Sequence, residues 1–276
     1  MAAGLYLTAT PIGNAADITL RALEVLQGCD LIAAEDTRVT AKLLAIHGIA
    51  KGLAAYNDHN AARARPHLLK LLRAGARIAL VSDAGTPLVS DPGFKLVRAA
   101  IAEGLGVHAV PGPSAVLAAL ALSGLPSDRF LFVGFLPARQ GERLSRLEEL
   151  NGVRATLIFF ESGQRLGECL KDMAARLGGR DAVVARELTK LHEEVRRDSL
   201  ASLAQVYGGK PPAKGEVTVL VSPPRQEAGA DLRLVDQALD KALIFMPLKP
   251  ASEMIAGLLG VSRHAIYARG LEKKSG

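Results

Sequence analysis

The sequence predicts an α/β protein made of two α/β domains and a small helical C-terminal extension. In its first part, short apolar runs alternate with amphipathic stretches, which is typical of a mainly parallel sheet with helices on both faces. A second series of apolar runs begins after the polar stretch GLPSDR at residues 124–129. Beyond the polar linker SPPRQEAGADLR, only helical patterns remain. We therefore expect domains at residues 1–124 and 125–224 and an extension at 232–276.

The first predicted domain opens with the apolar run GLYLTAT, a strand that ends in the turn PIGN. In the segment 17–28, Leu20, Leu23 and Leu26 recur at helical spacing, and Gly28 is a helix stop. The same alternation predicts strands at 30–35, 76–82 and 106–110 and helices at 40–48, 64–75, 93–104 and 114–124.

The second predicted domain has a different rhythm, with more strands than helices. Apolar runs predict its strands at 129–137, 155–162, 181–189 and 216–222. One helical pattern lies between them, at 165–178 (RLGECLKDMAARLG). We find no internal repeat and no low-complexity tract.

Composition limits the class of protein. The chain has 276 residues, of which 49% are hydrophobic, enough for the cores of two domains. Its two cysteines, Cys29 and Cys169, lie far apart without a CxxC motif, so we expect no disulfide framework and no metal site. No signal-peptide pattern and no apolar run of about 18 residues is present, which predicts a cytoplasmic protein without membrane association.

The net charge of +6 favours a polyanionic partner, most commonly nucleic acid. Much of this charge lies near the end, where six lysines and arginines from Lys241 onward stand against two acidic residues. Five residues there have the spacing of a helix-turn-helix, namely Ala256, Gly260, Val261, Ser262 and Ile266. We prefer an RNA-docking module that uses Arg263 and Arg269, although a helical hairpin with a solvated basic face has the same pattern.

Three predicted strands of the first domain end in loops rich in glycine and proline. Ligands of open α/β sheets bind beyond the carboxyl ends of strands, where glycine lets them approach the backbone. None of the loops is a GxGxxG fingerprint or a GxxxxGK[ST] phosphate loop, so the ligand is neither NAD nor ATP. The candidate ligand-binding residues are Pro11, Gly13 and Asn14, then Ser82, Asp83, Ala84, Gly85, Thr86 and Pro87, and finally Ser114 and Ala115.

Eight short motifs occur in a fixed order along the chain. They are TPIGN, LIAAEDTR, LVSDAGTPLVSDPG, VPGPSA, LSGLPSDRF, GFLP, FFES and ARELTK. In this order the chain resembles the bacterial small-subunit ribosomal RNA 2′-O-methyltransferases of the tetrapyrrole-methylase superfamily. The resemblance runs from Leu5 to Val221 and continues through the C-terminal helices.

The resemblance implies two α/β domains of tetrapyrrole-methylase type that hold S-adenosyl-L-methionine between them. The three loops would form the cofactor cradle, with Phe160, Ala185 and Thr218 meeting the adenine from the second domain. Asp83 would bind the cofactor or brace its loop, and we expect Asp91 to cap a helix. The resemblance also implies a homodimer and, as substrate, a decoding-centre cytidine of 16S rRNA in the assembled small ribosomal subunit.

A ribose 2′-hydroxyl is a poor nucleophile, so a base or a polarising cation near it would help. The polar residues of the motifs that could act are Glu35, Asp36, Arg38, Asp58, His59, Asn60, Glu161, Arg165, Arg186, Glu187 and Lys190. Of these, Glu35, Arg38, His59 and Glu161 are our candidates for catalysis, and Arg38, Asn60, Arg186 and Lys190 for binding RNA.

Each candidate also has a structural interpretation. Glu35 and Asp36 could cap a strand end or pair with Arg38, and His59 could be an ordinary loop histidine. Asn57 and Gln164 stand where the family more often has histidine, so a histidine base there would not transfer to this chain.

Two other functions use the same scaffold. The chain could methylate tetrapyrrole or corrinoid precursors, but the basic C-terminal segment and the AEDTR and ELTK motifs speak against this. It could also be a non-catalytic ribosome assembly factor, but the three intact loops speak against that.

Overall fold

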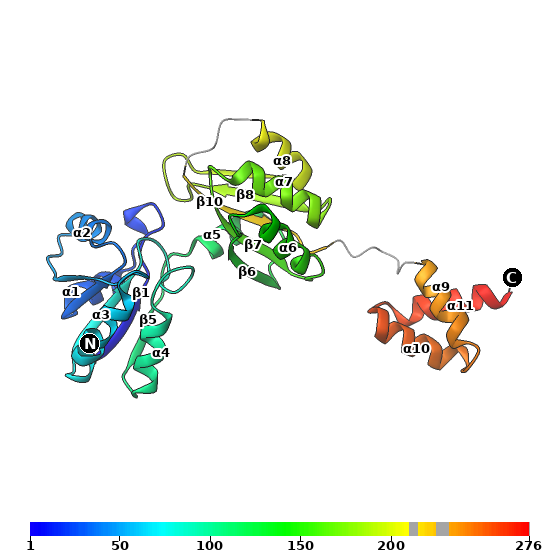
Figure 1. Ribbon diagram of the computed structural model, residues 1–276, viewed down its shortest axis with the longest axis horizontal. Helices are drawn as coiled ribbons and strands as arrows, with labels where there is room; N and C mark the ends of the chain where they lie inside the picture. Colours follow the sequence, from blue (N-terminus) through cyan, green and yellow to red (C-terminus); the bar gives the residue numbers. More distant parts are fainter. Residues whose placement is uncertain (210–214, 225–231, 276) are drawn as a thin grey trace. The chain divides into compact units, whose positions relative to one another are not determined.

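The computed structural model describes residues 1–209, 215–224 and 232–275 and divides into two compact units (Figure 1). The first unit spans residues 1–224 and holds two β-sheets, and the second spans residues 225–276 and is helical. Each unit is described by itself.

The first sheet has five parallel strands in the order β3-β2-β4-β1-β5. The strands are β1 (Gly4–Thr8), β2 (Leu31–Ala34), β3 (Leu53–Ala55), β4 (Arg77–Val81) and β5 (Val107–Val110). Side chains alternate between the faces, so that Ala79 and Val81 of β4 point one way while Ile78 and Leu80 point the other. The predicted parallel α/β arrangement is confirmed.

Helices cover both faces of this sheet. One face packs against α1 (Leu20–Gly28) and α2 (Thr37–Ile46), and the other against α3 (Ala61–Arg73) and α4 (Phe94–Ala102). The helix α1 begins with a Thr19 cap, which accepts a hydrogen bond from the backbone N–H of Ala22.

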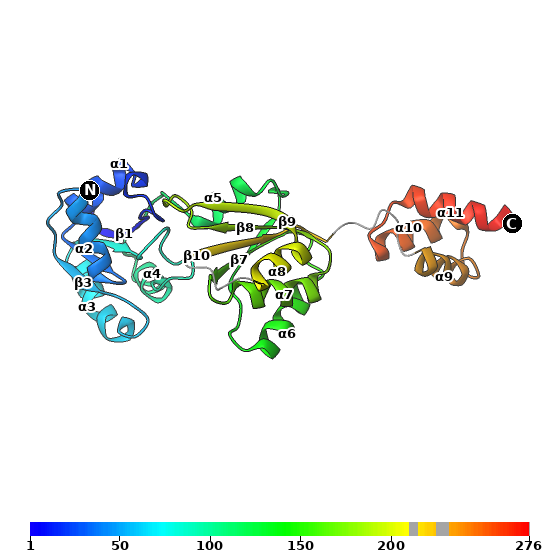
Figure 2. The same cartoon turned by 90° about the horizontal axis from the view of Figure 1, so that it is seen from above.

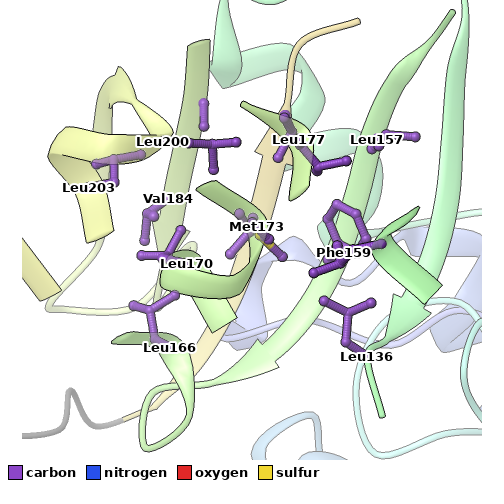
Figure 3. Close-up of a cluster of buried hydrophobic side chains, with 14 of the residues drawn as sticks. Leu136, Leu157, Phe159, Leu166, Leu170, Met173, Leu177, Val184, Leu200 and Leu203 are labelled. Atoms are coloured by element: carbon purple, nitrogen blue, oxygen red, sulfur yellow. The ribbon is translucent and has the colours of Figure 1, made fainter. Parts of the chain in front are cut away.

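The second sheet is mixed, with the order β6-β7-β10-β8-β9. Its strands are β6 (Phe130–Phe135), β7 (Thr156–Ser162), β8 (Asp181–Arg186), β9 (Glu194–Ser199) and β10 (Glu216–Val221). Only β6 and β7 pair in parallel, and the other pairs are antiparallel. One face carries α6 (Gln140–Leu150), α7 (Leu166–Leu177) and α8 (Leu200–Gly208), and Figure 3 shows the apolar core between them and the sheet.

The opposite face of the second sheet is covered by α5 (Ala115–Ser123), although this helix follows the last strand of the first sheet (Figure 2). Val116, Ala119 and Leu120 of α5 pack on Ile158 and Leu220 of the sheet. The helix therefore ties the two sheets together. The predicted domain boundary after residue 124 lies just past its end and stays a prediction.

Several elements escape sequence prediction because their apolar signal is weak. The strand β9 reads EVRRDS and lies at the sheet edge, where polar side chains are tolerated. The elements β3, α6 and α8 were likewise not predicted. The predicted strand 181–189 is wrong beyond Arg186, because Glu187 and Thr189 adopt positive φ angles of 51° and 64°.

The second unit contains three helices among its described residues: α9 (Leu232–Ala242), α10 (Leu248–Leu259) and α11 (Arg263–Ser275). Gly260 ends α10 in the left-handed conformation (φ 64°), which makes the turn into α11. Leu239, Ile255 and Ile266 form its core, one from each helix. Within the described part of the chain, no helix is long and apolar enough to span a membrane.

Replacing Phe159 by alanine tests the core of the second sheet. The ring is fully buried among leucines, and its loss leaves a cavity, so we expect the free energy of unfolding to fall by about 3–5 kcal/mol. Chemical denaturation measures this. The control Ile46→Ala, at an exposed position, should change it by less than about 0.5 kcal/mol, and equal effects would contradict the described packing.

Candidate functional site

The three loops predicted to bind a ligand meet at one edge of the first sheet. Because all five strands are parallel, their carboxyl ends lie at the same edge, and β4, β1 and β5 are direct neighbours. The backbones of Thr10 and Gly85 exchange two hydrogen bonds of 2.9 and 3.0 Å, which join the loops after β1 and β4. The Thr86 hydroxyl donates to the Pro113 carbonyl at 3.2 Å and joins the third loop.

A cavity of about 390 Å³ lies at these loops and extends to the second sheet. This volume lies within the range common for ligand sites. Both sheets contribute residues to the walls of the cavity. Its described lining residues are Ile12, Glu35, Asp83, Ala84, Gly85, Thr86, Val89, Ser90, Asp91, Ser114, Ala115, Phe135, Phe160, Glu161, Ser162, Ala185, Leu188, Gly215, Glu216, Val217 and Thr218.

Small residues and aromatic rings shape this cavity. Ala84 and Gly85 on one side and Ala185 on the other leave backbone accessible to a ligand. The rings of Phe135 and Phe160 meet edge to face with centroids 5.7 Å apart. Phe135 is 58% exposed, so this ring presents a free apolar surface beside the cavity.

A clamp, formed by the contact of Gly13 and Asn14 with residues 188–190, joins the PIGN and ELTK loops, which contribute Ile12 and Leu188 to the cavity lining. The backbone N–H of Asn14 donates to the Thr189 hydroxyl at 3.0 Å. A Cβ on Gly13 would lie 2.7 Å from that hydroxyl oxygen and 2.8 Å from the Leu188 carbonyl oxygen, so only glycine fits here. The Lys190 ammonium group holds the second loop by pairing with Glu187 and Glu216, each at 2.9 Å.

Acidic side chains gather on the first-sheet side of the cavity. Desolvation raises the pKa of Glu35 and of Asp83, and it raises that of Asp91 to about 6. The expected capping role of Asp91 is wrong, because Gly93 occupies the N-cap of α4 without a side-chain cap. The chain turns toward the cavity before it reaches the helix, with Leu88 and Ser90 at φ 73° and 66°.

Glu161 of β7 lines the cavity, and its carboxylate is held by neighbouring side chains and backbone. Its carboxylate accepts hydrogen bonds from the Ser162 N–H and the Cys169 thiol, both at 2.8 Å, and lies 3.4 Å from the Arg165 guanidinium. Arg165 also donates to the Leu136 and Pro137 carbonyls, which anchors the loop that follows Phe135. We assign Glu161 to this structural network.

The structure brings together most of the predicted cofactor-binding residues. Those that line the cavity are Asp83, Ala84, Gly85, Thr86, Ser114, Ala115, Phe160, Ala185 and Thr218. Pro11, Gly13, Asn14, Ser82 and Pro87 lie in the same loops without being part of the described lining. Of the catalytic candidates, Glu35 and Glu161 line the cavity, whereas Arg38 and His59 do not.

The predicted RNA contacts all have partners within the protein. Arg38 pairs with the α2 cap Asp36 at 2.6 Å, so the structural interpretation of Asp36 is confirmed. Asn60 donates to the Ala55 carbonyl. The remaining ion pairs are Arg186 with Glu194, Lys190 with Glu187 and Glu216, Arg263 with Glu253, and Arg269 with Asp236 and Glu272.

Sequence reasoning missed several lining residues. Phe135 lies in the GFLP motif and Asp91 in the DPG motif, so both were visible but neither was assigned to the site. Ile12, Val89, Ser90, Ser162, Leu188, Gly215, Glu216 and Val217 carry no chemical signal of their own. Among the described residues, no three His, Cys, Asp or Glu side chains lie close enough together to hold a metal ion.

The buried network predicts an unreactive thiol. Burial and the Glu161 carboxylate raise the pKa of Cys169 to about 12, so little thiolate forms at pH 8. In a Cys29→Ala background, we expect DTNB to modify Cys169 far more slowly in the folded than in the unfolded protein. Adding Glu161→Gln removes a negative charge and should speed the reaction; fast modification of the parent would contradict this burial.

Comparison with known proteins gives concordant matches. Residues 4–204 match the tetrapyrrole (corrin/porphyrin) methylases, and residues 227–274 match the RsmI C-terminal HTH domain, which bears out the predicted helix-turn-helix. The ribosomal RNA small subunit methyltransferase I of Mesorhizobium japonicum is 53% identical over 98% of this chain and 92% of its own. That of Erythrobacter litoralis is 49% identical over 99% of this chain and 96% of its own.

A solved structure supports the fold. The uroporphyrin-III C-methyl transferase of Thermus thermophilus, complexed with S-adenyl homocysteine, has a TM-score of 0.55 and 22% identity, covering 84% of this chain and 99% of its own. The chain belongs to the tetrapyrrole (corrin/porphyrin) methylases and, within them, to the ribosomal RNA small subunit methyltransferase I family.

Proposed function

We propose that this chain is an S-adenosyl-L-methionine-dependent methyltransferase that modifies a ribose 2′-hydroxyl of small-subunit ribosomal RNA. The observation that carries this proposal is the cavity at the carboxyl edge of the first sheet, with three glycine-proline loops on one side and Phe160, Ala185 and Thr218 on the other. The relatives named above are methyltransferases of small-subunit ribosomal RNA.

The residues of the cavity fit S-adenosyl-L-methionine. The cofactor carries a positive sulfonium, and the described lining contains the carboxyl groups of Glu35, Asp83 and Asp91 but no lysine, arginine or histidine. Ala84, Gly85 and Ala115 leave room against the backbone. When bound, the cofactor supplies an electrophilic methyl group, and the chain supplies alignment and exclusion of water.

The predicted cofactor-binding residues of the loops then fall into two groups. Those in the lining would contact the cofactor, while Pro11, Gly13, Asn14, Ser82 and Pro87 hold the loops in shape. Phe135 would offer its exposed ring to a base of the RNA, because unstacked bases pack on aromatic side chains.

The finer substrate is part of the proposal. We propose a cytidine of the decoding centre in 16S rRNA, presented by the assembled small subunit. Arg38, Asn60, Arg186, Lys190, Arg263 and Arg269 remain the proposed RNA contacts. Among these four arginines Arg38 is the most exposed, at 86% of its side chain, and its ion pair with Asp36 costs little to exchange for phosphate.

We also propose a cytoplasmic homodimer. The edge strand β6 exposes Phe130 and Leu131, and α5 exposes Leu117 and Leu122. Exposed apolar side chains on an unpaired sheet edge are typical of surfaces that bind another chain. Analytical ultracentrifugation tests the oligomeric state.

The function is tested by transfer of tritiated methyl from S-adenosyl-L-methionine to small subunits that lack the modification, with free 16S rRNA as a second acceptor. We expect label in subunit RNA at one 2′-O-methylated cytidine. Label in a corrinoid or porphyrin precursor instead would support a small-molecule methylase, and cofactor binding without transfer to RNA would contradict the proposed substrate.

Gly13→Ala probes the clamp. The added methyl collides with the Thr189 hydroxyl and the Leu188 carbonyl, so the ELTK loop, whose Leu188 lines the cavity, must shift. We expect the Kd for S-adenosyl-L-methionine to rise about ten-fold, equivalent to about 1.4 kcal/mol, by isothermal titration calorimetry. Gly141→Ala, where a Cβ meets nothing within 4 Å, is the matched control and should leave the Kd unchanged.

A further inference from the structure

Asp91 lines the cavity because of the backbone conformation of the residues before it. It belongs to the segment between β4 and α4, where Leu88 and Ser90 adopt left-handed backbone conformations. Such conformations are unfavourable in a non-glycine residue and persist only where the surroundings impose them. Gly93 is the N-cap of α4, so the carboxyl group of Asp91 is not used as a cap and lines the cavity instead.

The other carboxylates near the cavity are engaged by the protein. Asp83 accepts a hydrogen bond of 2.9 Å from the backbone N–H of Asp36 and so braces the loop after β2. Asp36 caps α2 and pairs with Arg38. Glu161 is fixed by the Ser162 N–H, the Cys169 thiol and Arg165. Glu216 pairs with the Lys190 ammonium group at 2.9 Å. Among the carboxyl groups of the described lining, this leaves Asp91 and Glu35.

Asp91 differs from Glu35 in the nature of its partner. Glu35 accepts from the backbone N–H of Asp83 at 3.4 Å, a fixed donor. The Ser82 hydroxyl donates to the Ala84 carbonyl at 3.3 Å and also acts on Asp91, and as a hydroxyl it can rotate as that carboxyl group changes charge. Asp91 is therefore better suited to gain and lose a proton.

The electrostatic surroundings of Asp91 are acidic. The charged groups that act on it are Glu35 at the end of β2, Asp83 after β4 and Asp58 after β3. Burial is the largest influence, and together these hold its pKa at about 6. A carboxylate of this kind is ionised at neutral pH and is a stronger base than an ordinary aspartate.

We infer that Asp91 is the proton acceptor for the methyl transfer. This rests on the proposed function. The Asp91 carboxylate takes the proton of the ribose 2′-hydroxyl as that oxygen forms its bond to the methyl carbon. The carbon–sulfur bond breaks at the same time, its electron pair stays on sulfur, and the proton passes from Asp91 to solvent after the product leaves.

Asp91→Asn tests this assignment, because asparagine keeps the shape and loses the base. We expect kcat for transfer to small subunits to fall by about 10²–10⁴-fold. The Kd for S-adenosyl-L-methionine, measured by calorimetry without RNA, should rise by less than about ten-fold, far less than the fall in kcat, because Glu35 and Asp83 keep their carboxyl groups in the cavity. Asp91→Glu restores a carboxylate and should recover part of the rate.

The pH profile gives a second readout. In the parent, kcat/KM should rise as Asp91 loses its proton and level off above about pH 7, since the pKa is raised to about 6. Asp91→Asn should lose this limb. Asp58→Asn is the matched control: it removes a neighbouring negative charge outside the cavity lining, so it should keep the rate and move the midpoint slightly lower.

The outcomes separate the two levels of the proposal. Absence of transfer by the parent protein would overturn the proposed function and this assignment with it. Transfer by the parent and by Asp91→Asn at similar rates would overturn the assignment alone. The assignment would also be overturned if weaker cofactor binding by Asp91→Asn explained its whole loss of activity. Asp91 would then act in cofactor binding and not as the proton acceptor.

Discussion

The contact between α5 and the second sheet is the interaction on which the site depends. The helix leaves the first sheet at the third ligand loop and buries Val116, Ala119 and Leu120 on Ile158 and Leu220. Burying one such large aliphatic side chain contributes about 1.5–3 kcal/mol. Because the cavity takes its walls from both sheets, this apolar cluster sets the distance between loops that are about one hundred residues apart in sequence. Ile12 of the PIGN loop belongs to the same cluster, so the loop that braces the cavity is anchored by it.

That apolar contact supports an arrangement of carboxyl groups whose mutual repulsion and desolvation are electrostatically unfavourable. Glu35, Asp83 and Asp91 are partly withdrawn from water, and their pKa values rise because the charged forms lose hydration. Mutual repulsion adds to this cost, since each is raised by at least one neighbouring carboxylate. A cation in the cavity would offset both penalties, because it attracts all three carboxylates. These carboxyl groups therefore favour a positively charged ligand in the cavity. The proposed cofactor carries such a charge on its sulfonium.

The sequence predicts the parts of the site that follow from a general rule of the fold. It does not predict the parts that depend on the backbone conformation or the tertiary neighbours of a few residues. The three loops were predictable because parallel strands present their carboxyl ends together. Asp91 was misjudged, since an aspartate before Pro-Gly at a helix start is a normal cap, and only the left-handed residues Leu88 and Ser90 redirect it. The polar edge strand β9 and the ring of Phe135 were missed for a related reason. Their role comes from tertiary neighbours, which periodicity does not report.

The ion pairs of the C-terminal unit bear on how it would meet RNA. Arg263, Arg269 and Lys273 each lie against a carboxylate of the same unit, so its basic charge is less free than the sequence indicates. Exposed pairs of this kind are worth about 0–1 kcal/mol, less than a charge-assisted contact to phosphate at low salt. Phosphates could therefore displace Glu253 and Asp236, but the exchange would weaken steeply as salt rises. Such a unit would add affinity without base specificity, and selection of the nucleotide would fall to the cavity of the first unit, where Phe135 and Asp91 lie.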